Sequence, residues 1–249
     1  TMIANVMHCT PSDKLNITTA ALLYDLGYLF VPRKILDKSD VDMTEEDDKV
    51  IHECRKRGYA LLDTEGNRYG MNQEIFTIIH VSLSTKRVDD LKTKKFSRAA
   101  KILIVADMFD QLTAMSLNQA PISEVSTVRY LRQYPERYSS NVVSALSHCI
   151  HILPVGSSID LSTGDKGIVL MENSQNFLAP VVLNIRDNHI YDLSNPMVAA
   201  KIQIIDIMKT MDNRIVIDET TLKQFSSDSK IKNTLNKYKE KENKIKFRK

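Results

Sequence analysis

Tyr24 and Asp25 adjoin inside an apolar stretch that runs from residue 20 to residue 27. A metal-dependent hydrolase needs neutral imidazoles and carboxylates that converge on its ions, and Asp25 could serve as one such carboxylate. A phenol, with a pKa of about 10, is a poor ligand at neutral pH, so Tyr24 does not complete a ligand pair. In a second interpretation, the Asp25 side chain caps or hydrogen-bonds the turn at Gly27.

Two more ionisable side chains lie in apolar surroundings. Asp107 is flanked by apolar residues throughout 104–108, where a carboxylate is costly unless it has a partner. His80 lies in the apolar run 75–81 and is the expected partner of Asp107, through either a direct hydrogen bond or a shared metal ion. Taken alone, His80 fits a hydrogen-bonded core histidine, and Cys54 fits a small buried hydrophobe.

The elements that must position these residues are predicted to be helices. Thr44, followed by the acidic run 45–48, has the pattern of a helix cap and an acidic first turn. Apolar residues recur at helical spacing in segments 73–82, 97–117, 123–134 and 141–151. Pro121 and Pro135 mark breaks between helices. We therefore expect a helical domain over residues 1–151.

The pattern changes to that of strands after residue 152. Residues 158–162 alternate, Thr163-Gly164-Asp165 predicts a turn, and 167–171 reads as a buried strand. Segments 180–185 and 201–205 continue the β pattern. We expect a small β-rich extension over 152–218, followed by a helical or disordered basic tail over 219–249.

Composition narrows the setting of the protein. The fractions of hydrophobic (43%) and charged (26%) residues are ordinary for a soluble globular protein. The sequence shows neither an apolar run long enough to span a bilayer nor a signal peptide. Its three cysteines form no Cys-x-x-Cys pair, which favours free thiols in the cytoplasm. Because the chain begins with Thr1, we expect it to be part of a longer protein.

The basic tail is the main charge asymmetry. Residues 230–249 hold eight lysines and one arginine against two glutamates. Such a tail can bind nucleic acid or anionic lipid, but the sequence carries no clear nucleic-acid signature elsewhere. We therefore interpret it as a solvated, frayed helix end.

Several segments, in this order and spacing, resemble an HD-GYP domain, the HD-superfamily branch that hydrolyses cyclic di-GMP in bacteria. The similarity runs through Ala20-Ala21-Leu22-Leu23-Tyr24-Asp25-Leu26-Gly27 and segments 31–36, 44–46 and 58–62, and it is sharpest over 99–113. Segments 154–156 and 161–169 are similar to the β extension that follows many HD-GYP domains. The resemblance implies a mainly α fold: an HD-superfamily helical bundle, then a small β-rich appendage and the basic tail. It also implies bacterial signalling and a homodimer or another protein partner.

Members of that family hold two or three metal ions, usually iron or manganese. Carrying the ligand set over places the following residues on family positions: Tyr24 and Asp25 on the His-Asp pair, Tyr28 on a phosphate-assisting lysine, Cys54 on a helix histidine, Ile79 and His80 on a His-His run, and Asp107 on the distal aspartate. The loop that names the family falls on 82–88, which lacks glycine, tyrosine and proline. The resemblance thus implies a vestigial metal site of Asp25, His80, Asp107 and Cys54, with Tyr24, Tyr28 and Ile79 as substituted positions.

These substitutions predict a catalytically impaired HD-GYP-like protein that acts in regulation or protein–protein interaction and needs no cofactor. One alternative is a sensor that binds a cyclic dinucleotide without cutting it. The loss of the family loop and of the basic stretch after Thr113 argues against it, because those residues would hold the guanines and phosphates. Another alternative is a weakly active phosphodiesterase with one divalent Fe or Mn ion at Asp25, His80 and Asp107.

Overall fold

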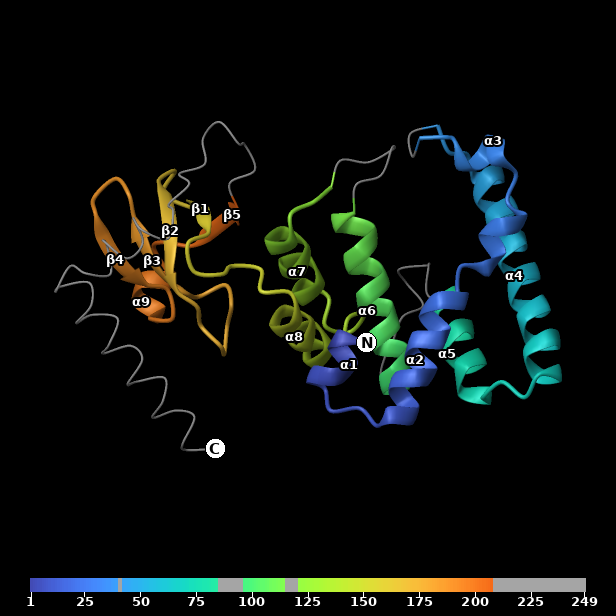
Figure 1. The fold of residues 1–249 in the computed structure, drawn as a ribbon. Coiled ribbons are helices and arrows are strands. Elements are labelled where there is room, and N and C mark those ends of the chain that lie inside the picture. Colours follow the sequence, from blue (N-terminus) through green and yellow to red (C-terminus); the bar gives the residue numbers. More distant parts are fainter. Residues whose placement is uncertain (40–41, 85–95, 115–120, 208–249) are drawn as a thin grey trace. The chain divides into compact units, whose positions relative to one another are not determined.

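The computed structural model describes residues 1–39, 42–84, 96–114 and 121–207 (Figure 1). The chain divides into two compact units, residues 1–150 and residues 151–249. The first unit is helical, and the described part of the second is built around a small antiparallel sheet. The predicted fold class, mainly α with a β-rich appendage, is therefore confirmed. The predicted basic tail, 219–249, lies outside the described residues.

The first unit is a succession of helices, most of them short. They are α1 (Met2–Val6), α2 (Pro11–Leu23), the 3₁₀ helix η1 (Leu26–Phe30), α3 (Arg33–Leu36), α4 (Glu45–Arg68), α5 (Gln73–Ser84), α6 (Arg98–Thr113), α7 (Glu124–Gln133) and α8 (Ser140–Cys149). The four helices predicted from apolar spacing are α5 to α8, with ends shifted by a few residues. Within the described part of the chain, no helix is both long and apolar enough to cross a membrane.

A reciprocal cap fixes the start of α4. The hydroxyl of Thr44 accepts a hydrogen bond from the backbone N–H of Asp47, and the Asp47 carboxylate accepts one from the backbone N–H of Thr44. Lys38 donates to the same carboxylate across the preceding loop. These bonds, from Lys38 first and then from Thr44, lower the pKa of Asp47 to about 2. The predicted cap at Thr44 is confirmed.

The core of the helical unit lies around α6, which contacts α2, α5, α7 and α8. Every residue from Ile102 to Val105 on α6 is buried. The facing helices contribute apolar side chains that are also buried: Ile75, Phe76, Ile78 and Ile79 from α5, Val125, Val128 and Leu131 from α7, and Val142 and Val143 from α8. This packing places the C-terminal part of α6, which includes Asp107, beside the end of α2.

Two glycines allow η1 to lie directly on α4. A Cβ atom on Gly58 would lie 2.4 Å from the Cα of Gly27, and a Cβ atom on Gly27 would lie 2.4 Å from the Cα of Arg55. Side-chain carbons essentially never approach so closely, so only glycine fits at both positions. The contact brings the turn that carries Asp25 and Tyr28 against the middle of α4.

The second unit contains a five-stranded antiparallel sheet in the order β4-β3-β2-β1-β5. The elements are β1 (Ser158–Leu161), β2 (Lys166–Met171), β3 (Val181–Asn184), β4 (His189–Asp192), the short helix α9 (Pro196–Ala199) and β5 (Ile204–Ile207). The predicted turn between the first two strands is confirmed, with Gly164 at a φ of 81°. The strand predicted over 201–205 is partly wrong, because β5 begins only at Ile204.

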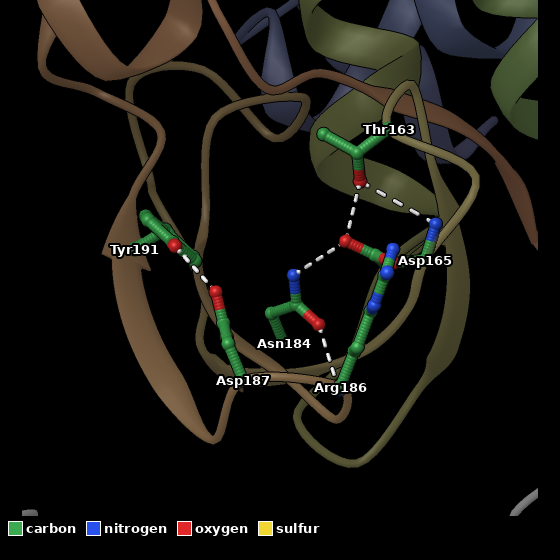
Figure 2. A network of polar contacts seen from close by, with 6 residues as sticks. All are labelled: Thr163, Asp165, Asn184, Arg186, Asp187 and Tyr191. Atoms are coloured by element: carbon green, nitrogen blue, oxygen red, sulfur yellow. Dashed lines mark hydrogen bonds and ion pairs between the residues drawn. The ribbon is translucent and has the colours of Figure 1, made fainter.

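A carboxylate ties the β1–β2 turn to the end of β3 (Figure 2). Asp165 accepts hydrogen bonds from the Thr163 hydroxyl at 2.9 Å, from Nδ2 of Asn184 at 2.9 Å and from the Arg186 guanidinium at 3.2 Å. Oδ1 of Asn184, a residue only 2% exposed, accepts from the Arg186 backbone N–H. The network links the β1–β2 hairpin to the β3–β4 hairpin, so its contacts lie within the sheet and its turns.

Candidate functional site

Tyr24 meets Asp107 where α2 ends beside α6. The Tyr24 backbone N–H donates to the Ala20 carbonyl, so Tyr24 continues the last turn of α2 as its C-cap residue. Its hydroxyl donates to Oδ1 of Asp107 at 2.8 Å. Burial first, then the charge and hydrogen bond of Asp107, and then the charge of Asp25 raise the pKa of Tyr24 far above its usual value. The phenol is therefore a neutral donor at physiological pH.

Asp107 is held a second time from its own helix. Nε2 of Gln111, one turn further along α6, donates to the same Oδ1 atom at 2.8 Å. The structure gives Asp107 two donors that the sequence did not predict, Tyr24 and Gln111, whereas His80 was the expected partner. The carboxylate in its apolar surroundings is thus stabilised by neutral protein donors.

His80 lies on the outer face of α5. Its neighbours Ile78 and Ile79 are buried, but His80 itself is exposed, so its interpretation as a core histidine is wrong. The imidazole packs against Tyr59 of α4, with the ring centroids 5.5 Å apart. Ile79, which the resemblance placed on a family histidine, is a core residue with 1% exposure.

Asp25 faces a buried arginine. Asp25 occupies the N-cap position of η1, but its side chain makes no capping hydrogen bond, so the capping half of the second interpretation is wrong. Instead, its Oδ1 lies 3.6 Å from a terminal nitrogen of Arg55, whose side chain is only 6% exposed. The Arg55 guanidinium carbon also lies 5.5 Å from the centroid of the Tyr28 ring, within the range of a cation–π contact.

Sequence reasoning missed Arg55, although a signal for it exists. Arg55 falls in line with Gly58, Leu62 and Gly66, the other buried residues of the middle of α4, at spacings of three and four. A charged residue within the buried stripe of a helix calls for a partner. The neighbouring Cys54 is half-buried, and its thiol donates to the carbonyl of Phe30 at 3.3 Å.

The donor set does not fit a metal cluster. Across residues 1–39, 42–84, 96–114 and 121–207, no three side chains of His, Cys, Asp or Glu are gathered so that they could hold an ion. Of the four sequence candidates, Asp25 and Asp107 both lie near Tyr24, whereas His80 and Cys54 make separate contacts. The two carboxylates meet a guanidinium and a phenol, which donate hydrogen bonds and compete with any cation.

Comparison with known proteins places this site in a family. A family model for the HD domain matches residues 1–142, more than half of the chain. The chain belongs to the HD domain family. All the candidate residues of the HD domain, from Tyr24 to Asp107, lie inside the matched range.

One curated relative refines this assignment. Over 170 residues the chain is 24% identical to the cyclic di-GMP phosphodiesterase PA4108 of Pseudomonas aeruginosa. The alignment covers 66% of this chain but 39% of that protein, so the chain spans about two fifths of the length of this relative. The two comparisons together confirm an HD-GYP-like domain of the HD superfamily, as the sequence motifs predicted.

Proposed function

We propose that this HD-GYP-like domain is catalytically impaired and acts in bacterial signalling by binding a protein, either another component or a second copy of itself. The proposal rests on one observation: the hydroxyl of Tyr24 donates to Asp107 at the position where the resemblance puts a metal-binding imidazole. Hydrolysis of a phosphodiester by this family needs ions that activate water and neutralise the phosphate. A protonated phenol supplies neither a ligand lone pair of comparable strength nor a positive charge.

The remaining carboxylate supports the same conclusion. Asp25 faces the charge of Arg55, so its negative charge is already compensated by the protein. His80, exposed on α5 and packed on Tyr59, supplies one imidazole at most. Transition-state stabilisation of a phosphoryl group would lack the cluster of charge on which it depends.

The direct test is an assay of the purified chain with cyclic di-GMP in the presence of Mn²⁺ or Fe²⁺, with the Pseudomonas aeruginosa relative as a positive control. We expect no linear dinucleotide and no GMP from this chain, and fewer than one bound metal ion per chain by elemental analysis. Steady product formation at a rate comparable with that of the control would overturn the proposal.

Two further measurements separate the alternatives. Calorimetry with cyclic di-GMP that shows binding without turnover would favour a sensor. Turnover that disappears in Asp107→Ala, while that variant keeps its circular dichroism spectrum, would instead favour a weak phosphodiesterase with a single ion. Co-purification with one defined partner, or a dimer in solution, is the outcome expected from our proposal.

A further inference from the structure

Arg55 is a buried positive charge at the centre of the candidate site. Its side chain is 6% exposed, whereas the facing Asp25 side chain is 48% exposed, so the arginine lies beneath the carboxylate. A guanidinium stays protonated at any physiological pH and cannot escape the cost of burial by losing its proton. Something in the site must therefore stabilise a fixed cation at this depth.

Hydrogen bonding does not account for the position of Arg55. Its Nε atom is buried and has no acceptor within the described residues. Among the described residues, the charge of its guanidinium faces the Asp25 carboxylate at 3.6 Å and the Tyr28 ring, whose centroid is 5.5 Å from the guanidinium carbon. The surroundings thus balance the charge of the side chain and leave part of its hydrogen-bonding capacity unused.

The backbone holds this charge in place. The Cα of Arg55 forms the wall against which Gly27 packs, so Arg55 and the turn that carries Asp25 and Tyr28 cannot separate without breaking the glycine contact. Two residues at family positions therefore face Arg55 directly: the retained aspartate and the tyrosine that replaces a lysine.

We propose that Arg55 is the resident cation of this site. It neutralises and positions the Asp25 carboxylate, as a divalent ion does in metal-dependent relatives. At the other carboxylate, Asp107, the protein also supplies the partner itself, because the neutral Tyr24 hydroxyl donates a hydrogen bond to it. The inference rests on the proposed function, because both require a site without a metal cluster. It adds that the frame of the site is stable without metal because the protein supplies its own cation.

The proposal predicts that removing Arg55 lets the Asp25 carboxylate bind a divalent cation weakly, at millimolar concentration, although the change adds no further ligand. Thermal unfolding is measured in metal-free buffer and again with millimolar Mn²⁺, and free Mn²⁺ is followed by electron paramagnetic resonance. We expect Arg55→Gln to lower Tm by about 5 °C, because it leaves a carboxylate without its counter-charge. Mn²⁺ should restore part of this loss in Arg55→Gln and leave the Tm of the parent unchanged.

A double-mutant cycle identifies Asp25 as the partner. Asp25→Asn alone should also lower Tm, since it strands the buried guanidinium, and the double variant should lose less than the sum of the two single losses. The double variant should also lose the response to Mn²⁺. Additive losses, or a Mn²⁺ response as large in the parent as in Arg55→Gln, would overturn the inference.

Matched controls guard against trivial explanations. Arg33 and Asp37 form an exposed ion pair at 3.7 Å, almost the same separation as Arg55 and Asp25, so Arg33→Gln should change neither Tm nor the response to Mn²⁺. If Arg55→Gln does not fold, Arg55→Lys and Asp25→Asn decide the matter. The lysine variant should then keep most of the parent's Tm, and an Asp25→Asn variant as stable as the parent would refute the proposal.

These outcomes are separable from those of the proposed function. Hydrolysis of cyclic di-GMP by the parent would end the proposed function, whatever the Arg55 variants do. If the chain does not hydrolyse cyclic di-GMP and the double-mutant cycle of Arg55 and Asp25 shows additive losses of Tm, only this inference is refuted.

Discussion

The Tyr24 hydroxyl and the Asp107 carboxylate, 83 residues apart in sequence, are joined by a hydrogen bond of 2.8 Å. The bond connects the end of α2 to the C-terminal half of α6. Its acceptor is the carboxylate that the family resemblance assigns to a metal ion. One contact therefore supports the fold and also involves a candidate ligand. Substitutions of Tyr24 or Asp107 should change both the stability of the chain and its ability to bind a ligand.

Removing the Tyr24 hydroxyl should destabilise the helical unit. Tyr24→Phe leaves Asp107 with Gln111 as its donor, and a lost hydrogen bond to a half-buried carboxylate costs about 1–2 kcal/mol. Denaturant unfolding measures the loss. Tyr191→Phe is the matched control, because Tyr191 makes a bond of 2.7 Å to Asp187 at the surface of the other unit, and its removal should cost less than about 0.5 kcal/mol.

The same phenol should make stability sensitive to alkaline pH. The pKa of Tyr24 is raised in the folded chain by burial and by Asp107, so above a pH of about 10 the unfolded state loses its phenol proton while the folded state keeps it. The parent should therefore lose stability relative to Tyr24→Phe as pH rises beyond about 10. A stability difference between the two that stays constant from pH 8 to pH 11 would contradict this prediction.

The cap of α4 should fail in acid. The pKa of Asp47 is lowered to about 2 in the folded chain from its ordinary value of 3.8, so the contribution of its carboxylate to stability is complete above a pH of about 4 and is lost as pH falls toward 2. Asp47→Asn should remove this pH-dependent part of the helical signal measured by circular dichroism. Glu46→Gln breaks only an exposed pair with Lys49 and should leave the acid profile unchanged.

Adding one methyl group at the contact between Gly27 and Gly58 should strongly lower the stability of the helical unit. Gly27→Ala and Gly58→Ala each force a carbon to within 2.4 Å of backbone atoms, and overpacking of this kind costs about 3 kcal/mol. Gly70→Ala is the control, because Gly70 has a φ of 72° but open space around it, so only backbone strain of about 1 kcal/mol applies. Equal losses at Gly58 and Gly70 would show that the close contact is not decisive.

Local signals in the sequence predicted most of the helices and the first hairpin. The cap at Thr44 and the apolar spacing of α5 to α8 depend on neighbours within one or two turns, which a sequence displays directly. Strand β4 was not predicted, because the sequence from His189 to Asp192 mixes polar and apolar residues and pairs along one side only, at the sheet edge.

The contacts within the candidate site were harder to foresee. His80 follows two buried isoleucines, yet one further step of 100° around the helix turns its side chain toward solvent. The partners of Asp107 and Asp25 come from α2 and α4, and no local pattern specifies which long-range pairs form. Arg55 was overlooked because an arginine in a highly charged helix is usually solvent-exposed.

The touching main chains of Gly27 and Gly58 have a consequence for how such a protein can diverge. The junction is specified by two missing side chains and by no property of any ligand. Side chains beside the junction, such as Tyr24 and Arg55, can therefore vary in kind while the main-chain architecture around them persists. In this chain the two glycines keep η1 seated on α4 whatever side chains line the site beside them.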